Sequence, residues 1–250
     1  MSEPMIRLNP ALDEAALGRT LVDHRRLQVR DFLVGEDAER IHGLLARETP
    51  WWTAFNDGER VAQMSPDFAA RVTPQQVAEI RAGIHQRAQR QYQFFYDYYP
   101  LFAHYFMPEI PWMPLFEVYE WLNSERTLGF LRRLTGRDDI RWADGQATLY
   151  RAGHFLQCHT DEQKNEQRLA AYVLNLTKDW SSDWGGYLQF FDAQSDVDHG
   201  FRPIFNALNI FLIPAVHNVG MVASYAPGMR YSITGWLRGD DPPGEFNRPR

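Results

Sequence analysis

The sequence predicts an α+β fold in which helices of the first half pack against an antiparallel jelly roll formed by the second half. Between residue 15 and about residue 135, apolar positions recur at helical spacing. From about residue 140 onward, short runs rich in β-branched and aromatic residues alternate with turn residues, as is typical of antiparallel barrels and sandwiches. With 250 residues and 44% hydrophobic content, the chain can bury a substantial core.

The first half is expected to contain four helices and one strand. Thr73 can act as the N-cap of the third helix, with Pro74 at its first position, and Pro100 marks its end. The strand is expected in "RLQVRDFLV", where bulky apolar residues interrupt the helical pattern. The helices are expected at 15–27, 35–48, 73–99 and 115–136, and the strand at 26–34.

The second half is expected to supply the strands of the jelly roll. The polar stretch "DAQSDVDHGFRP" is expected to be a loop, and its residues 193–203 are a candidate lid over the site. The chain is therefore expected to form one domain over residues 1–250, with mainly helical support at 1–135, a jelly-roll core at 136–238 and a tail at 239–250. The β-like runs are 140–153, 168–177, 185–192, 207–215, 220–226 and 230–238.

Charge and cysteine content limit the classes of partner. A formal charge of -6 and a pI near 5.8 do not favour nucleic-acid binding. No window of about 18 uninterrupted apolar residues occurs, so no membrane span is expected. A single cysteine, Cys158, excludes an internal disulfide and favours a reducing, cytoplasmic location. The oligomeric state stays open.

The run "HFLQCHTDEQ" carries the first candidate metal ligands. Side chains two positions apart on a strand share a face, so His159 and Asp161 can offer a nitrogen and an oxygen to one point. His217, in "IPAVHNVG", is the candidate for the third ligand of a two-histidine, one-carboxylate site. A chance His-x-Asp is not rare in a chain with eight histidines, so the tripeptide alone is weak. Structural or surface roles are expected for the other histidines: His24, His42, His85, His104, His154 and His199.

Arg230, in "MRYSITGWLR", is the candidate anion-binding residue. An arginine inside a barrel is costly unless a carboxylate meets its guanidinium group. A dicarboxylate such as 2-oxoglutarate could chelate a metal at one end and pair with Arg230 at the other, near Ser232 and Thr234. The alternative is an ion pair between Arg230 and a core aspartate or glutamate.

These residues occur in an order that resembles a known family. The runs "LYRAGHFLQCHTDE", "LAAYVLNLTKDWSSDWGGYLQFF", "PAVHNV" and "RYSITGWLR", over about residues 140 to 238, resemble the catalytic domain of iron(II)/2-oxoglutarate-dependent dioxygenases. The similarity is greatest to the prolyl-hydroxylase branch, and within it to the ribosomal-protein prolyl hydroxylases. The resemblance implies a double-stranded β-helix fold. It also implies that His159, Asp161 and His217 hold iron and that Arg230 pairs with the distal carboxylate of 2-oxoglutarate, helped by Ser232 or Thr234.

The resemblance also implies further pocket residues. Tyr150 would line the co-substrate pocket, Leu156 would pack against the methylenes of 2-oxoglutarate, and Trp236 would form an aromatic wall beside the iron. Asn175 falls where relatives place a pocket tyrosine, so its contact with the co-substrate would be shorter or passed to Tyr150.

The implied function is that of a single catalytic domain that hydroxylates a prolyl residue in a protein or peptide, with release of succinate and CO2. Fe(II), 2-oxoglutarate and O2 are the implied cofactors and co-substrates, with ascorbate as a candidate reductant. The carboxylate of Asp161 favours hydroxylation over halogenation. Two alternatives stay open: a hydroxylase of free amino acids or other small molecules, and a non-catalytic, cupin-like module that binds metal or 2-oxoglutarate.

Three further expectations concern packing. Cys158 is expected in the core, on the strand face opposite to His159. The aromatic run "YQFFYDYYPLFAHYF" is expected to pack as helix against the barrel, with a substrate platform as the alternative. "WWTAF", near residue 51, is expected either to rim a pocket or to fill a core.

Overall fold

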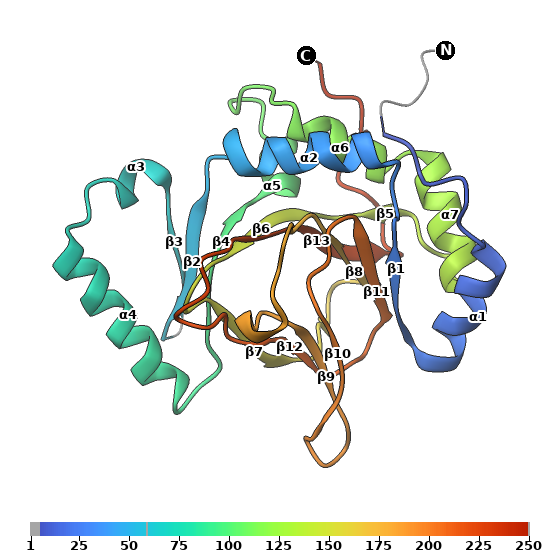
Figure 1. Ribbon diagram of the computed structural model, residues 1–250. Helices are drawn as coiled ribbons and strands as arrows, with labels where there is room; N and C mark the ends of the chain where they lie inside the picture. The colour runs from blue at the N-terminus through green and yellow to red at the C-terminus, as the bar shows by residue number, and fades with distance from the viewer. Residues whose placement is uncertain (1–5, 59, 250) are drawn as a thin grey trace.

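The computed structural model describes residues 6–58 and 60–249, and its centre is one antiparallel sheet that curls into a nearly closed barrel (Figure 1). Among the described residues, ten strands follow one another in the order β1-β11-β8-β13-β6-β4-β7-β12-β9-β10, and three more pair off this path: β2 with β4, β3 with β2, and β5 with β13. The strands are β1 (Arg26–Arg30), β2 (Trp52–Asp57), β3 (Arg60–Met64), β4 (Phe94–Tyr99), β5 (Trp142–Ala143), β6 (Gln146–Tyr150), β7 (Phe155–His159), β8 (Arg168–Asn175), β9 (Leu188–Phe191), β10 (Val197–Phe201), β11 (Ala207–Leu212), β12 (His217–Val219) and β13 (Arg230–Arg238).

The helices surround the barrel on three sides. Figure 1 shows α2 and α6 across the top of the barrel, α1 and α7 at one side, and α3 with α4 as an arm at the other. No helix formed by the described residues has both the length and the apolar character needed to cross a bilayer. The helices are α1 (Glu14–His24), α2 (Gly35–Arg47), α3 (Pro66–Ala69), α4 (Pro74–Ala88), α5 (Leu101–Tyr105), α6 (Leu115–Leu122) and α7 (Glu125–Thr135), with a 3-10 turn, η1, at Ser182–Trp184.

The third helix begins as the sequence predicts and ends earlier. The Thr73 hydroxyl accepts from the backbone N–H of Gln76, and the side-chain oxygen of Gln76 accepts from the backbone N–H of Thr73. These two bonds form a capping box at the start of the helix, where Pro74 is the first residue. The helix then stops at Ala88 instead of continuing to residue 99. Residues 94–99 of the aromatic run that follows form strand β4, so their prediction as helix was wrong, whereas residues 101–105 of the same run form the short helix α5. Tyrosine and phenylalanine favour strands, and pairing of β4 with β2 and β6 stabilises this segment as a strand instead of a helix.

Three other boundaries also differ from the predictions. The helix expected at 115–136 is two helices, because the Ser124 side chain caps the amide of Thr127 and starts a new one. "WWTAF" supplies most of β2, which pairs with β3 and β4. The stretch expected as a loop at 192–203 contains β10, which forms a hairpin with β9. The first 135 residues therefore contribute four strands to the sheet in addition to their helices.

Alternation along β8 separates the main core from the barrel interior. Tyr172 and Leu174 point outward into the hydrophobic core beneath α2, α6 and α7. Ala171 and Val173 point inward, where they pack with Phe211 and line a cavity. The strands thus bury one face against helices and leave the other face for a site.

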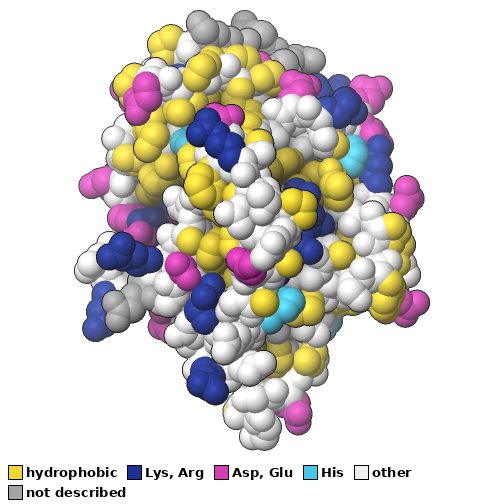
Figure 2. All heavy atoms as spheres, turned by 90° about the vertical axis from the view of Figure 1, so that its left-hand side faces the viewer, with side chains coloured by type: hydrophobic (Ala, Val, Ile, Leu, Met, Phe, Trp, Pro, Cys, Tyr) yellow, Lys and Arg dark blue, Asp and Glu magenta, His cyan; other side chains and the backbone are white. Residues whose placement is uncertain are grey.

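Cations and anions are interspersed on the face of the molecule that carries α3 and α4. Figure 2 shows this face, with hydrophobic side chains gathered mainly in its upper part and no large patch of a single charge. This face therefore lacks the continuous basic surface that phosphate backbones require.

Candidate active site

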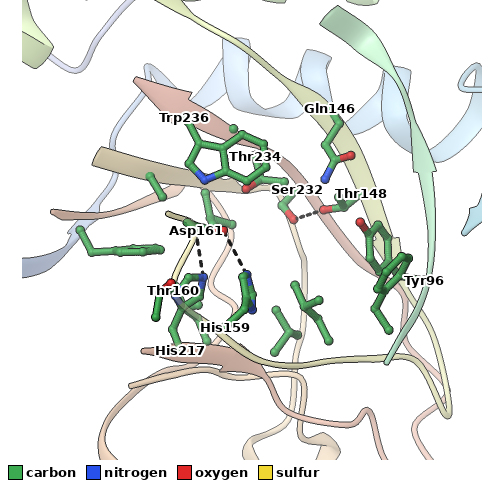
Figure 3. Close-up of a pocket in the computed structure, with 18 of the residues that line it drawn as sticks. Tyr96, Gln146, Thr148, His159, Thr160, Asp161, His217, Ser232, Thr234 and Trp236 are labelled. Carbon is green, nitrogen blue, oxygen red and sulfur yellow. Dashed lines mark hydrogen bonds and ion pairs between the residues drawn. The ribbon is translucent and has the colours of Figure 1, made fainter. Parts of the chain in front are cut away.

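A cavity of about 550 Å³ lies inside the barrel and is lined by side chains from β4, β6, β7, β8, β12 and β13. Figure 3 shows His159, Asp161 and His217 turned toward one another on one side of it, with Thr148 and Ser232 further along. The volume is in the range of small-molecule sites in proteins.

The structure brings together the three side chains that the sequence singled out as metal ligands. His159 is the last residue of β7, and His217, the first residue of β12, lies directly opposite it in the antiparallel pair. The His159 Nε2 atom lies 3.1 Å from Asp161 Oδ1, and the His217 Nε2 atom lies 3.3 Å from Asp161 Oδ2. One ligand atom from each of the three residues lies within 4.8 Å of the others.

Asp161 reaches this point from a loop and not from the strand that carries His159. Strand β7 ends at His159, and Asp161 has a left-handed backbone with φ 64°. The expectation that both residues share one strand face therefore gave the right meeting point for the wrong reason. A left-handed non-glycine residue is uncommon and marks a position where function or packing holds the backbone.

Hydrogen bonds to backbone carbonyls fix the tautomers of both histidines. The Nδ1 atom of His159 lies 2.9 Å from the Gln157 oxygen, and that of His217 lies 2.8 Å from the Ala215 oxygen. A carbonyl oxygen can only accept, so each Nδ1 carries a proton and each Nε2 presents a lone pair unless the ring is cationic. The Nε2 lone pairs and the carboxylate of Asp161 repel one another, and a bound cation would remove this repulsion because all three groups could coordinate it. The donor set fits a divalent metal with histidine and carboxylate ligands.

The charges within this cluster support one another. Burial disfavours the carboxylate of Asp161, but His159 and His217, which can donate to it from Nε2 when their rings are cationic, outweigh burial and lower the pKa of Asp161. Burial also acts against the cationic form of His159, and the neighbouring Asp161 reverses this effect, so the pKa of His159 is raised. Asp161 therefore stays ionised, as a metal ligand must.

Arg230 lies in the same cavity with no carboxylate partner among the described residues. Its exposed fraction is 2%, and its Nε atom has no hydrogen-bond partner. Its guanidinium carbon lies over the ring of Tyr150, 4.9 Å from the centroid, and burial lowers the pKa of Arg230. The alternative in which Arg230 pairs with a core aspartate or glutamate is not seen among these residues. A buried cation without a partner fits an anionic ligand.

The other predicted pocket residues line the cavity, with one exception. Tyr150, Leu156, Ser232, Thr234 and Trp236 all do so. The Ser232 and Thr148 hydroxyls lie 2.7 Å apart, and the Thr234 hydroxyl donates to the Tyr172 oxygen at 2.9 Å. The Tyr150 ring stacks on that of Tyr96.

Asn175 is the exception, because it is not among the residues that line the cavity. It is fully buried, and its amide nitrogen lies 3.3 Å from the Val173 oxygen and 3.4 Å from the Ala207 oxygen. Its short side chain is held by these backbone groups of β8 and β11, whereas a tyrosine at the same position would extend further.

Sequence reasoning missed several cavity residues. Tyr92, Phe94 and Tyr96 line the cavity from the aromatic run that was predicted to be helix. Every residue from 94 to 99 except Asp97 is aromatic, so no alternation of polar and apolar residues marked this segment as a strand. Gln146 and Thr148 were missed as well, although they lie four and two positions before Tyr150 on β6 and so share its face of the strand. Arg168, at the start of β8, stacks on Trp236 with its guanidinium carbon 3.5 Å from a ring centroid.

Cys158 is exposed, so its prediction as a core residue was wrong. Cys158 does not line the cavity that holds His159, and its side chain is open to solvent. None of the six other histidines lines the cavity, and the most buried of them, His154, packs against Phe95 with ring centroids 4.3 Å apart.

Comparison with known proteins shows what the second half of the chain resembles. Residues 145–238 match the family model described as the 2OG-Fe(II) oxygenase superfamily. The chain is 31% identical over 138 residues to the mouse protein "Prolyl 3-hydroxylase OGFOD1", and this alignment covers 51% of the chain and 25% of that relative. The chain thus spans about a quarter of the length of this relative.

Solved structures share the fold at low sequence identity. A Pseudomonas putida prolyl-4-hydroxylase has a TM-score of 0.57 at 18% identity, covering 90% of this chain and 98% of that one. A Burkholderia pseudomallei 2OG-Fe(II) oxygenase family oxidoreductase has a TM-score of 0.60 at 15% identity, covering 94% of each chain. A Trichoplax adhaerens prolyl hydroxylase, solved with a hypoxia-inducible-factor peptide fragment, has a TM-score of 0.56 at 17% identity, covering 90% of this chain and 89% of that one.

These structures share a double-stranded β-helix, and the barrel described above has the same architecture. Residues 145–238 are therefore similar to the 2OG-Fe(II) oxygenase superfamily in sequence, and the barrel is similar to these structures in fold.

Proposed function

We propose that this protein is an iron(II)- and 2-oxoglutarate-dependent dioxygenase that hydroxylates a prolyl residue in a protein or peptide. The observation that carries the proposal is the presence of two complementary elements in one cavity. One is a two-histidine, one-carboxylate cluster, and the other is Arg230, a buried guanidinium group without a carboxylate partner among the described residues. A keto-dicarboxylate such as 2-oxoglutarate has one group for each.

His159, Asp161 and His217 would hold the metal, each through an atom that already faces the other two. When bound, iron would supply the coupled oxidation in which O2 and 2-oxoglutarate yield succinate, CO2 and a hydroxyl group on the substrate carbon. The carbonyl oxygens of Gln157 and Ala215 keep the two imidazole rings in the tautomer that leaves Nε2 free for the metal.

Arg230 would bind the distal carboxylate of 2-oxoglutarate with its unpaired N–H groups. Ser232 lies two positions further along the same strand and, with Thr148, can donate a hydroxyl to the same carboxylate. Tyr150, stacked between Tyr96 and Arg230, would fix the position of the guanidinium group, and Leu156 would pack against the methylenes. These contacts would orient the co-substrate and exclude water from it.

A protein or peptide substrate is favoured by the opening of the cavity. Val61 and Tyr92 line it although 58% and 44% of their surfaces are exposed, so the cavity reaches the surface of the molecule. A residue of an extended chain can enter such a site, whereas a hydroxylase of free amino acids is expected to enclose its substrate. The prolyl hydroxylases among the relatives and structural neighbours support proline as the target.

We further propose that the chain works as one catalytic domain, with residues 136–238 as its core, 1–135 as support and 239–250 as a tail. Strands β1, β2 and β4 of the first part pair into the same sheet as the core, which supports one unit. Residues 1–5, Glu59 and Arg250 lie outside the described part. The single cysteine supports a cytoplasmic location, and ascorbate is proposed as a reductant that keeps the iron ferrous.

The test combines two measurements on the purified, iron-loaded protein. Succinate release is measured with and without a library of proline-containing peptides, and mass spectrometry identifies any peptide that gains one oxygen on proline. Succinate that rises with such a peptide supports the proposal. Asp161→Ala should abolish both signals, and Asp23→Ala, an exposed change on α1, should leave both unchanged. Substrate-dependent succinate with oxygen added only to free amino acids would contradict the peptide assignment, and no succinate with any peptide or amino acid would contradict the activity.

A further inference from the structure

A second groove, separate from the active site, lies where the barrel fails to close. Its volume is about 570 Å³, and it is lined by residues of α1 and β1 on one side and of β10 and the segment after it on the other. Strands β1 and β10 are the two ends of the strand order, so each has a neighbouring strand on one side only (Figure 1).

Among the described residues, two polar side-chain interactions join β1 to β10 and the segment after it. Arg26 of β1 forms an ion pair with Asp198 of β10. The Gln28 amide nitrogen donates to the Arg202 oxygen at 3.1 Å. The same nitrogen lies 2.9 Å from Asn209 Oδ1, so Gln28 keeps a partner if it releases Arg202. Side chains rather than backbone hydrogen bonds therefore hold the two edges near each other.

The lining is cationic. It contains three arginines, Arg26, Arg30 and Arg202, and two histidines, His24 and His199, and no aspartate or glutamate among the described lining residues. Asp198 neutralises Arg26, but neither Arg30 nor Arg202 has a carboxylate partner in the described part of the chain. The guanidinium group of Arg202 donates to the Trp180 oxygen at 2.6 Å. This local positive charge contrasts with the net charge of -6 on the whole chain.

Aromatic rings separate this groove from the proposed iron site. The guanidinium carbon of Arg26 lies 5.2 Å from the Phe190 ring centroid, and the ring of His217 lies 6.1 Å from the same centroid. Phe201 and Phe211 pack edge-on against Phe190 at 5.8 Å and 5.1 Å. Binding in the groove therefore leaves the metal ligands untouched.

We propose that this groove binds an extended, acidic segment of a partner protein. The segment would pair with the open edge of β1 as an added strand, and its acidic side chains would face Arg30 and Arg202. The unpaired strand edges offer alternating backbone N–H and C=O groups, with which a peptide can pair as an added strand and a nucleic acid cannot. This inference does not depend on the proposed hydroxylase activity.

The probe is a fluorescein-labelled peptide of about seven alternating glutamate and valine residues, a typical strand length. Fluorescence anisotropy with the full chain should show saturable binding. Arg30→Gln and Arg202→Gln should each weaken binding about fivefold, because each removes one partly exposed charge contact. Arg137→Gln, which alters an exposed pair with Asp139 outside the groove, is the matched control and should not weaken binding.

A second peptide separates strand pairing from charge attraction. It carries the same side chains but has N-methyl groups on alternate amides, which remove the donors needed for pairing. Its affinity should be lower by about tenfold or more. Equal binding of both peptides, or binding that survives both arginine substitutions, would overturn the proposal. Tighter, arginine-dependent binding of a single-stranded oligonucleotide would overturn it in favour of a nucleic-acid groove. Circular dichroism of each variant verifies that it is folded.

Discussion

The guanidinium carbon of Arg230 lies 4.9 Å from the centroid of the Tyr150 ring, and both side chains are buried. Without a ligand, this contact is the main compensation that the described residues provide for the buried charge of Arg230. A cation–π contact offsets only part of the cost of burying a cation. The buried charge of Arg230 should therefore be more fully compensated when an anionic ligand is bound than in the free protein.

Replacing Arg230 by methionine is expected to separate stability from ligand binding. Arg230→Met removes a buried, incompletely paired charge, so the melting temperature without 2-oxoglutarate should stay the same or rise. The affinity for 2-oxoglutarate should fall about 30-fold or more, because losing one partner of a buried charge pair costs about 2 kcal/mol or more. Calorimetric titration with Mn(II) present and thermal unfolding check the two effects. A large loss of stability with unchanged 2-oxoglutarate binding would contradict this role.

Loss of a metal ligand is expected to act on metal affinity directly. Asp161→Ala removes the oxygen donors that both Nε2 atoms face, so Co(II) or Mn(II) affinity should fall by at least about 100-fold. Titration calorimetry on the metal-free protein measures this without any turnover. Asp23→Ala serves as the control because Asp23 is exposed on α1. Metal affinity that is equal in the two variants would exclude Asp161 as a ligand.

A pH effect on stability is expected from His154. Burial lowers the pKa of His154 to about 4, whereas an unfolded histidine titrates near about 6.5. Between these values the unfolded state binds a proton that the folded state does not, so stability is lost as the pH falls from about 6.5 toward 4. His154 should contribute up to about 1.4 kcal/mol per pH unit in this window. Urea unfolding of wild type and His154→Gln should give curves that converge with acid, and parallel curves would exclude the effect.

Cys158 is expected to react in the folded protein. Its thiol is exposed and does not line the cavity, so a thiol reagent should label one site per chain under native conditions. Metal affinity should change little after labelling, because the label lies on the outer face of β7. Labelling that occurs only after unfolding would contradict the exposed position of this residue.

The residues of the site could be predicted from the sequence because their chemistry restricts their identity. A two-histidine, one-carboxylate metal site restricts its ligands to imidazole and carboxylate groups, which His159, Asp161 and His217 supply. A buried arginine needs an anionic partner, which made Arg230 a candidate for binding the co-substrate. The position of Asp161 could not be predicted in detail. Its left-handed backbone depends on the loop after β7, which the tertiary structure holds and no local pattern encodes.

The aromatic run before Pro100 shows where local patterns fail. Phe94 and Tyr96 face the cavity while Phe95 and Asp97 face the arm formed by α3 and α4, so both faces of β4 are covered. A strand buried on both faces has no polar side, and its alternation disappears from the sequence. Cys158 shows a second limit of local patterns. Its apolar side chain suggested a covered face of the strand, but that face is exposed to solvent.

The pairing of His159 with His217 across β7 and β12 has a consequence for the motions of the barrel. Few ladder positions join these two strands, and their register is irregular after His217. A metal held by both imidazoles would act as a crosslink between segments far apart in the chain. Backbone amides of Asn218 and Val219 should then exchange with deuterium more slowly in the loaded protein than in the free one.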